Sequence, residues 1–199
     1  MLHYKSVNRE LLELLAFLMR QQEFDNFTLV GGTSLALQIG HRISIDIDLF
    51  GKSEIDEQAF LQILKNKGDL HVLKKSKNIL ICSVGGIKVD FVNYQYDMLE
   101  KPIIIDSIRL TSMQDIAAMK INAIAGRGSK KDFIDFYYLL GYYTLEEMLS
   151  FYLKKYPDGS EFMARKSLTY FDDADNEETP LIFENISWQV IKKKILDEQ

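Results

Sequence analysis

The sequence predicts an α+β fold, in which a mixed β-sheet flanked by helices is followed by a helical C-terminal region. Short apolar runs bounded by glycines and polar turn residues fill much of the first half, as expected for strands. Past Pro102 the apolar residues follow helical spacing, and serine or threonine precedes several of these stretches. We therefore expect an α/β domain at residues 1–110 and a helical region at 111–199 packed against it, with a cleft between the two.

The first elements are expected to alternate between helix and strand. Residues 7–22 carry leucines at helical spacing, with Asn8 and Ser6 as candidate N-caps, which predicts an amphipathic helix covering one face of a sheet. "FTLVGG" is typical of a short buried strand that ends in a turn. "SLALQI" predicts a short helix, and "ISIDIDLF" predicts the next strand, with Ile45, Ile47 and Leu49 facing the core.

The rest of the sheet follows a third helix. Residues 53–68 combine an apolar run with a closing glycine, which predicts that helix. "HVLKKS" and "NILICSV" read as strands, and "IKVDFVNY" follows them. Only Gly85 and Gly86 separate the last two strands, and a two-residue glycine linker is a strong hairpin signal.

The second half is expected to be helical after one last strand, "SIRL". Pairs of a hydroxyl residue and a polar residue three positions later have the spacing of a capping box. Three such pairs predict helix starts, namely Thr111 with Gln114, Ser129 with Asp132, and Thr144 with Glu147. Further helices are expected at 160–170 and from Ser187 onward, with a solvated acidic loop at 172–178.

Composition indicates a soluble globular protein of the cytoplasm. Of 199 residues, 47% are hydrophobic and 27% charged, and no apolar run is long enough to cross a membrane. The first residues lack the basic-then-apolar order of a secretion signal. A formal net charge of -5 argues against non-specific capture of nucleic acid. The single cysteine, Cys82, lies among apolar residues and is expected to be a buried thiol.

Two aspartates two positions apart point to a metal. In a strand, Asp46 and Asp48 project from one face, about 6.6 Å apart at roughly 3.3 Å per residue. Carboxylates held that close repel each other unless a cation lies between them. Oxygen ligands without a cysteine or histidine pair favour Mg²⁺ or Mn²⁺ over zinc.

A glycine turn precedes these aspartates by about a dozen residues. Gly31 and Gly32 end a strand and open a helix, so the main chain can approach a ligand closely and present N–H groups to an anion. Thr33 and Ser34 would add hydroxyl donors. Phosphate is the expected anion, and the metal would bridge the same phosphate groups.

The two motifs in this order resemble the signature of the nucleotidyltransferase superfamily, which has the polymerase-beta-like fold. The resemblance implies a nucleoside triphosphate at the glycine turn and metal on the carboxylates for in-line transfer of a nucleotidyl group. Such sites usually need a third carboxylate from a neighbouring strand. Asp90, mid-strand between apolar Val89 and Phe91, is the best candidate, with an exposed acid on a hairpin as the alternative.

A closer resemblance extends over about residues 24–194. "LVGGTSLALQIGHRISIDIDLF" resembles the opening of the AbiEii/AbiGii toxin family, nucleotidyltransferase-like proteins of bacterial abortive-infection and toxin–antitoxin systems. "MKINAIAGRGSKKDFIDFYYLL" resembles its second conserved block. "YFDDADNEETP" and "ISWQVIKKKI" are similar to its C-terminal region.

The second block supplies further candidate residues. The resemblance implies that Lys120 neutralises triphosphate charge, although a lysine on a helix can also extend to solvent. Arg127 is a candidate partner for phosphate or for an acid of the next helix. Asp132 fits a capping role, so Asp135 is the better candidate for a catalytic or orienting carboxylate.

Two residues behind the glycine turn are assigned to structure. His41 is expected to be a satisfied structural histidine, and Arg42 is expected to hold a carboxylate in place. Neither is chosen as a base. Lysines at 74, 75, 77 and 192–194 are either RNA contacts or solvated faces.

The sequence thus predicts a Mg²⁺-dependent nucleotidyltransferase of the AbiEii toxin type in a toxin–antitoxin or abortive-infection system. Its acceptor would be RNA such as a tRNA end, and a helix-turn-helix antitoxin would be its partner. GTP and pyrimidine triphosphates both stay open as donors. One alternative is a small-molecule nucleotidyltransferase that modifies an aminoglycoside. Another is a module that binds nucleotide or a partner without turnover, although three converging acids argue against it.

Overall fold

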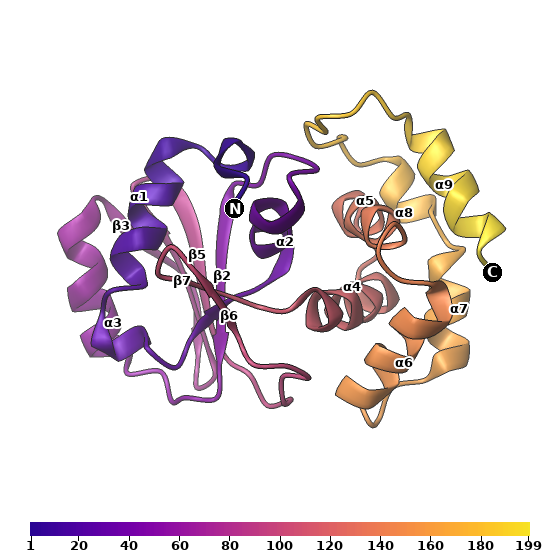
Figure 1. The fold of residues 1–199 in the computed structure, drawn as a ribbon. Coiled ribbons are helices and arrows are strands. Elements are labelled where there is room, and N and C mark those ends of the chain that lie inside the picture. The colour runs from indigo at the N-terminus through magenta and orange to yellow at the C-terminus, as the bar shows by residue number, and fades with distance from the viewer. The chain divides into compact units, whose positions relative to one another are not determined.

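The computed structural model describes residues 1–199, which form two compact units. The first unit comprises Met1–Gly40, Ser44–Asp97 and Pro102–Thr111, and it carries the β-sheet. The second unit comprises His41–Ile43, Met98–Lys101 and Ser112–Gln199, and it is helical. Figure 1 shows the strands in the indigo-to-magenta half of the chain and a run of helices in the orange-to-yellow half. The predicted α+β class is confirmed.

One seven-stranded sheet forms the centre of the first unit, in the order β3-β4-β5-β2-β1-β7-β6. Strands β2 and β5 run parallel, as do β1 and β7, while the other neighbours are antiparallel, so the sheet is mixed. The strand bounds are β1 Thr28–Leu29, β2 Asp46–Gly51, β3 Leu70–Ser76, β4 Ile79–Val84, β5 Ile87–Asn93, β6 Ile103–Ile105 and β7 Ile108–Leu110.

Helices α1 (Arg9–Leu18) and α3 (Glu57–Leu64) contribute the leucines and Phe60 that pack on one face of this sheet. Asn8 caps α1 as predicted, since its side chain accepts a hydrogen bond from the Leu11 N–H. The buried face of the sheet includes Ile47, Leu49, Val89 and Phe91. The remaining helices of the unit are η1 Tyr4–Ser6, η2 Gln22–Phe24, α2 Gly31–Ile39 and η3 Lys65–Lys67.

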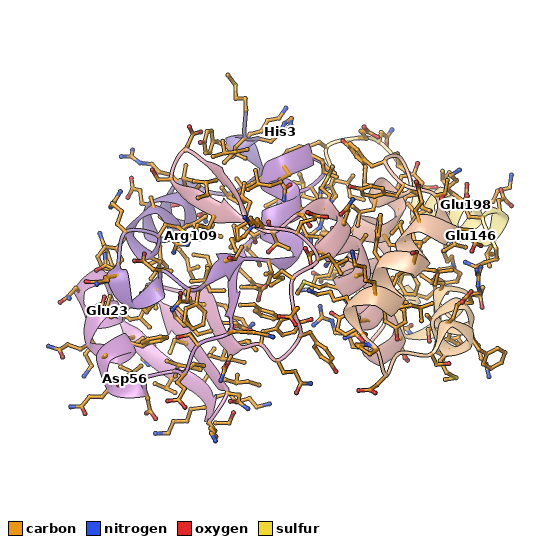
Figure 2. The ribbon with its side chains drawn as sticks, turned by 60° about the horizontal axis from the view of Figure 1, so that its bottom comes forward. His3, Glu23, Asp56, Arg109, Glu146 and Glu198 are labelled. Carbon is orange, nitrogen blue, oxygen red and sulfur yellow. The ribbon has the colours of Figure 1, made fainter.

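Arg109 of β7 fastens the loop between α1 and β1. Its guanidinium donates hydrogen bonds to the carbonyl oxygens of Phe27, Met19 and Phe24 at 2.9, 3.0 and 2.9 Å. Figure 2 labels this side chain on the unit that carries the sheet. The bonds satisfy carbonyls of the segment that connects α1 to β1, which holds the entry to β1 in place.

Two hairpins of the sheet have two-residue turns with positive φ, and the sequence predicted one of them. Gly85 and Gly86 join β4 to β5 with positive φ at both residues, as the two-residue linker predicts. The hairpin between β6 and β7 was not predicted. Its turn residues, Asp106 and Ser107, also have positive φ although neither is glycine.

Three other details correct the sequence-based expectations. Ile45 is 66% exposed and does not face the core, because β2 begins one residue later, at Asp46. The N-cap of α4 (Met113–Gly126) is Ser112, whose hydroxyl accepts from the Asp115 N–H. Thr111 instead extends β7, since its N–H donates to the Leu29 carbonyl.

In the second unit, α4 packs against α5 (Lys130–Leu139), α6 (Leu145–Lys155) and α7 (Glu161–Leu168). The capping box predicted for α6 is confirmed by reciprocal bonds between Thr144 and Glu147. The short helix α8 (Asp172–Asp175) lies where a loop was expected, and α9 (Trp188–Asp197) follows. No helix of the chain has the length and apolar character needed to cross a bilayer.

Candidate active site

The three predicted metal-binding aspartates share one face of two neighbouring strands. Asp46 and Asp48 lie on β2 and Asp90 on β5, and the parallel register places Asp48 opposite Asp90. Directly paired residues on strands about 4.8 Å apart project to the same side of a sheet. Ile47 and Leu49 alternate with the two β2 aspartates and are buried on the other side. The sheet therefore gathers these carboxylates as the alternation predicts.

The glycine turn lies directly against this carboxylate face, which consists of Asp46, Asp48 and Asp90. The Val30 N–H donates to the Asp48 carbonyl at 2.9 Å, which ties the end of β1 to β2. Gly31 then opens α2 with a φ of +67°. A Cβ atom at this position would lie 2.9 Å from Asp48 Oδ2, so both the backbone conformation and the space require glycine.

The hydroxyls of Thr33 and Ser34 do not lie where the sequence-based expectation put them. Both side chains are buried. The Thr33 hydroxyl bonds to the Asp46 carbonyl and to Ser44, and the Ser34 hydroxyl accepts from the Gln38 amide. The Thr33 hydroxyl therefore holds the turn onto the start of β2, while the Ser34 hydroxyl is bonded within α2. The first N–H groups of α2 remain the groups of the turn suited to an anion.

Lys88 joins the carboxylate face from β5. It lies opposite Asp46 in the strand register, and its Nζ is 2.6 Å from Asp90 Oδ2. Burial acts to lower the pKa of Lys88. The hydrogen bond to Asp90 and the negative charges of Asp90, Asp48 and Asp46 outweigh burial and raise that pKa. Lys88 was not among the predicted site residues, although the alternation of "IKVD" places Lys88 and Asp90 on the same side.

The donor set of this face fits a divalent cation. Its ligands would be carboxylate oxygens, which Mg²⁺ and Mn²⁺ prefer. Asp90 Oδ1 is buried without a hydrogen-bond partner, which is costly for a carboxylate oxygen unless a ligand satisfies it. As the side chains lie, no three histidine, cysteine, aspartate or glutamate side chains form a ready-made metal cluster. A cation would therefore require the carboxylates to re-orient within the face.

The candidates of the second block form a buried ionic network in the helical unit. Asp135 is fully buried, and Arg42 donates to both of its oxygens at 2.6 and 2.9 Å. The His41 ring nitrogen Nε2 and the Lys120 ammonium lie 2.7 and 2.6 Å from the same carboxylate. Arg42 thus holds a carboxylate in place as the sequence suggested. Asp135 in turn fixes the short segment His41–Ile43, and its catalytic assignment stays a prediction.

Asp132 does more than occupy the first turn of α5. Its carboxylate accepts from Lys120, Arg127 and Ser129 at distances between 2.7 and 3.1 Å. The Lys120 side chain is only 6% exposed, whereas that of Arg127 is 63% exposed. Lys120 is therefore engaged with two acids of its own unit, whereas the Arg127 side chain reaches solvent.

Electrostatics keep this network charged. Burial acts to raise the pKa of Asp135, but the charges of Arg42 and Lys120 and the bonds from Arg42 and His41 hold that pKa well below its ordinary value. Asp132 shifts in the same direction because Lys120 and Arg127 outweigh its burial. Burial lowers the pKa of His41 despite the nearby Asp135. The imidazole is then neutral at pH 7, and its buried Nδ1 has no partner.

Cys82 takes no part in either group of residues. It is fully buried in β4, and burial raises the pKa of its thiol to about 11. A nucleophilic cysteine needs a thiolate near neutral pH. The expectation of a buried, unreactive thiol agrees with this environment.

Comparison with known proteins identifies the class. MenT4, a nucleotidyltransferase toxin from Mycobacterium tuberculosis H37Rv, shares the fold over 96% of this chain and 84% of its own, with a TM-score of 0.61 at 12% sequence identity. The structure of JHP933 from Helicobacter pylori matches 96% of this chain and 95% of its own, with a TM-score of 0.56 at 18% identity. The fold is thus that of the nucleotidyltransferases.

The family follows from the sequence profile described as "Nucleotidyl transferase AbiEii toxin, Type IV TA system", which matches residues 13–199. The chain belongs to this family of nucleotidyltransferase toxins, as the resemblance predicted. A toxin of this kind implies a nucleotide substrate and an antitoxin. An uncharacterized protein of Aquifex aeolicus strain VF5 is 36% identical over 177 residues, covering 85% of this chain and 84% of that protein.

Proposed function

We propose that the protein transfers a nucleotidyl group from a nucleoside triphosphate to an RNA acceptor, such as a tRNA end, with Mg²⁺ or Mn²⁺ as cofactor. The observation that carries the proposal is the direct contact between the glycine turn and the carboxylate face, where position 31 has no room for a Cβ beside Asp48. A polyphosphate at the turn would lie next to the carboxylates, because the two elements adjoin within one unit.

The residues of the first unit are assigned to two roles, triphosphate binding and metal binding. The N–H groups of Gly31, Gly32 and Thr33 open α2 and are assigned to the triphosphate, whereas the Ser34 N–H already donates to the Val30 carbonyl. Asp46, Asp48 and Asp90 are assigned to the metal. The cation, when bound, would supply positive charge to the phosphate oxygens. A carboxylate of this face would accept the proton of the acceptor hydroxyl as that oxygen attacks the α-phosphorus. The bond to the β-phosphate breaks, and pyrophosphate leaves.

The residues of the helical unit act in support. We assign Lys120 and Asp135 to the network that orients Arg42 and His41, since both are buried within it. Arg127 is the second-block residue assigned to an anion, because its side chain is 63% exposed while one side of the guanidinium is held by Asp132. Lys120 would add positive potential near that anion without contacting it.

The family supports the partner and the compartment that we propose. A helix-turn-helix antitoxin and a cytoplasmic location both fit a toxin–antitoxin protein without a membrane-spanning helix. The net charge of -5 disfavours an acceptor held by general attraction to phosphate. The acceptor would therefore be recognised by shape at the site, which a tRNA end provides.

The experiment is transfer of label from the α-phosphate of each of the four ribonucleoside triphosphates to total cellular RNA. The wild-type protein should label a discrete RNA band with a preferred triphosphate, and Asp48→Asn should abolish labelling. The matched control is Asp56→Asn, which removes a carboxylate from the exposed N-cap of α3 and should keep transfer.

Other outcomes separate the alternatives. Labelling of an aminoglycoside but not of RNA would favour a small-molecule nucleotidyltransferase. Triphosphate binding without pyrophosphate release under any acceptor would favour a binding module. Transfer by Asp48→Asn at the wild-type rate would refute the proposal.

A further inference from the structure

We propose that Lys88 is the resident counter-ion of the carboxylate face: its ammonium holds Asp90 in the metal-free protein, and a divalent cation must displace it to bind. The inference rests on the proposed function in one respect, since it takes the carboxylate face to be the metal site. It adds a residue that competes with the metal and so sets the concentration at which the site fills.

The position of Lys88 is built into the sheet. Lys88 and Asp90 are two residues apart on β5, so their side chains leave the same face, and Asp46 lies opposite Lys88 on β2. The ammonium lies 2.6 Å from Asp90 Oδ2, inside hydrogen-bonding distance. The Lys88 side chain is 41% exposed and that of Asp90 only 15%, so the lysine ammonium reaches the Asp90 carboxylate from the solvent side.

The face needs a positive charge whether or not metal is present. Three carboxylates on one side of two adjacent strands repel each other. A lysine ammonium is a mobile point charge on a flexible stem, so it can neutralise the face and still withdraw. Arginine in that place would bind a carboxylate with a rigid two-pronged geometry and withdraw less readily.

Competition with metal follows from the atoms involved. Asp90 Oδ2 is the oxygen that Lys88 holds, while Asp90 Oδ1 is buried without a partner. A cation that used Asp90 together with Asp48 would approach the carboxylate from the face where the ammonium lies. Two positive charges at that distance repel each other, so the lysine must move toward solvent.

The experiment is calorimetric titration of the full-length, nucleotide-free protein with Mn²⁺ alone. Lys88→Met should bind Mn²⁺ about five- to tenfold more tightly than wild type, the size expected when one partly screened charge leaves a binding site. Lys88→Arg should bind no more tightly than wild type, because it keeps the charge. The matched control is Lys74→Met. Lys74 pairs with Ile81, which pairs with Asp90, so Lys74 lies on the same sheet face but two strands away from Asp90. The Mn²⁺ affinity of this variant should stay within about twofold of the wild-type value. Equal or weaker binding by Lys88→Met would overturn the proposal.

A second measurement works without metal and separates this proposal from the proposed function. In chelator, Lys88→Met should lower the melting temperature by roughly 2–4 °C. Asp90→Asn in the Lys88→Met background should cause no further loss, because the pair is already broken. Additive losses would overturn the counter-ion role even if transfer is intact. Non-additive losses in a protein that never binds Mn²⁺ and never transfers label would leave Lys88 as a structural counter-ion, and would overturn both the competition and the proposed function.

Discussion

The Asp135 carboxylate is fully buried and faces three basic side chains, those of Arg42, His41 and Lys120. Asp135→Ala would leave the arginine and lysine charges buried without their partner. Breaking a buried ion pair in this way costs about 3–5 kcal/mol. We therefore expect the free energy of unfolding, measured by urea denaturation, to fall by that amount.

An exposed ion pair provides the control for this substitution. Arg9 and Glu13 pair across one turn of α1 with side chains 87% and 63% exposed. Glu13→Gln should cost under about 0.5 kcal/mol, because solvent screens the pair. A loss for Asp135→Ala no larger than this would contradict the account of the buried network.

Acid should destabilise the protein through two groups of residues. Asp132 and Asp135 have lowered pKa values in the folded state, so their contribution is complete above the ordinary aspartate pKa of about 3.9 and is lost as the pH falls below it. The pKa of His41 is also lowered, so the unfolded chain takes up a proton first, and stability already declines below about pH 6.5.

Melting temperatures measured between pH 8 and pH 3 test whether stability falls on acidification. We expect a shallow fall beginning near pH 6.5 and a steeper one below about pH 4. His41→Gln should flatten only the shallow part. A melting temperature that rises on acidification across either window would show that the directions of these pKa shifts are wrong.

At the scale of elements, the start of α2 depends on Gly31. Alanine there would adopt a left-handed conformation at a cost of about 1–2 kcal/mol, and its Cβ would meet Asp48 Oδ2 at 2.9 Å. Asp48 must then shift, and a displacement of about 1 Å at a reacting group can cost roughly a hundredfold in rate. Gly31→Ala should therefore reduce label transfer by about that factor.

The control glycine lies within a helix. Gly126 ends α4, is absent from the positive-φ residues, and has no atom of a neighbour within 4 Å of where an added Cβ would lie. Gly126→Ala should leave transfer unchanged and should not lower the melting temperature, since alanine favours the helical conformation. Equal losses of transfer in both variants would mean that the glycine turn has no special role.

Elements with strong local signals could be predicted from the sequence. The Asn8 cap, the Gly85–Gly86 turn and the Thr144 capping box all use short-range hydrogen bonds that residue type dictates. The hairpin of β6 and β7 was not predicted because its turn residues, Asp106 and Ser107, adopt positive φ without being glycine. The sequence therefore lacks the glycine signal of such a turn. The N-cap of α4 lies one residue later than predicted, because the Thr111 N–H donates a hydrogen bond to the Leu29 carbonyl in the sheet.

The candidate site was predictable only in part, for a similar reason. The alternation along each strand indicated which face Asp46, Asp48 and Asp90 would share, and the register confirms that they share it. Which hydroxyls turn inward and which lysine pairs with Asp90 depends on tertiary contacts. Thr33, Ser34 and Lys88 could therefore not be placed correctly from the sequence alone.

At the scale of the whole molecule, two short segments belong to a different compact unit from the residues that flank them in the sequence. Residues 41–43 and 98–101 lie within residues 1–110 but belong to the helical unit. The first segment is held there by Asp135 and by backbone bonds such as Ile43 to Leu181, and the second by Asp115, which accepts from the Leu99 N–H. These bonds join residues far apart in sequence, so no local pattern reveals them.

The most direct test of the central claim compares label in the α-phosphate with label in the γ-phosphate of the preferred triphosphate. The account predicts that the wild-type protein attaches only the α-label to its acceptor and releases the γ-label as pyrophosphate, and that Asp48→Asn does neither. Attachment of the γ-label, or undiminished α-label transfer by Asp48→Asn, would contradict nucleotidyl transfer at the carboxylate face.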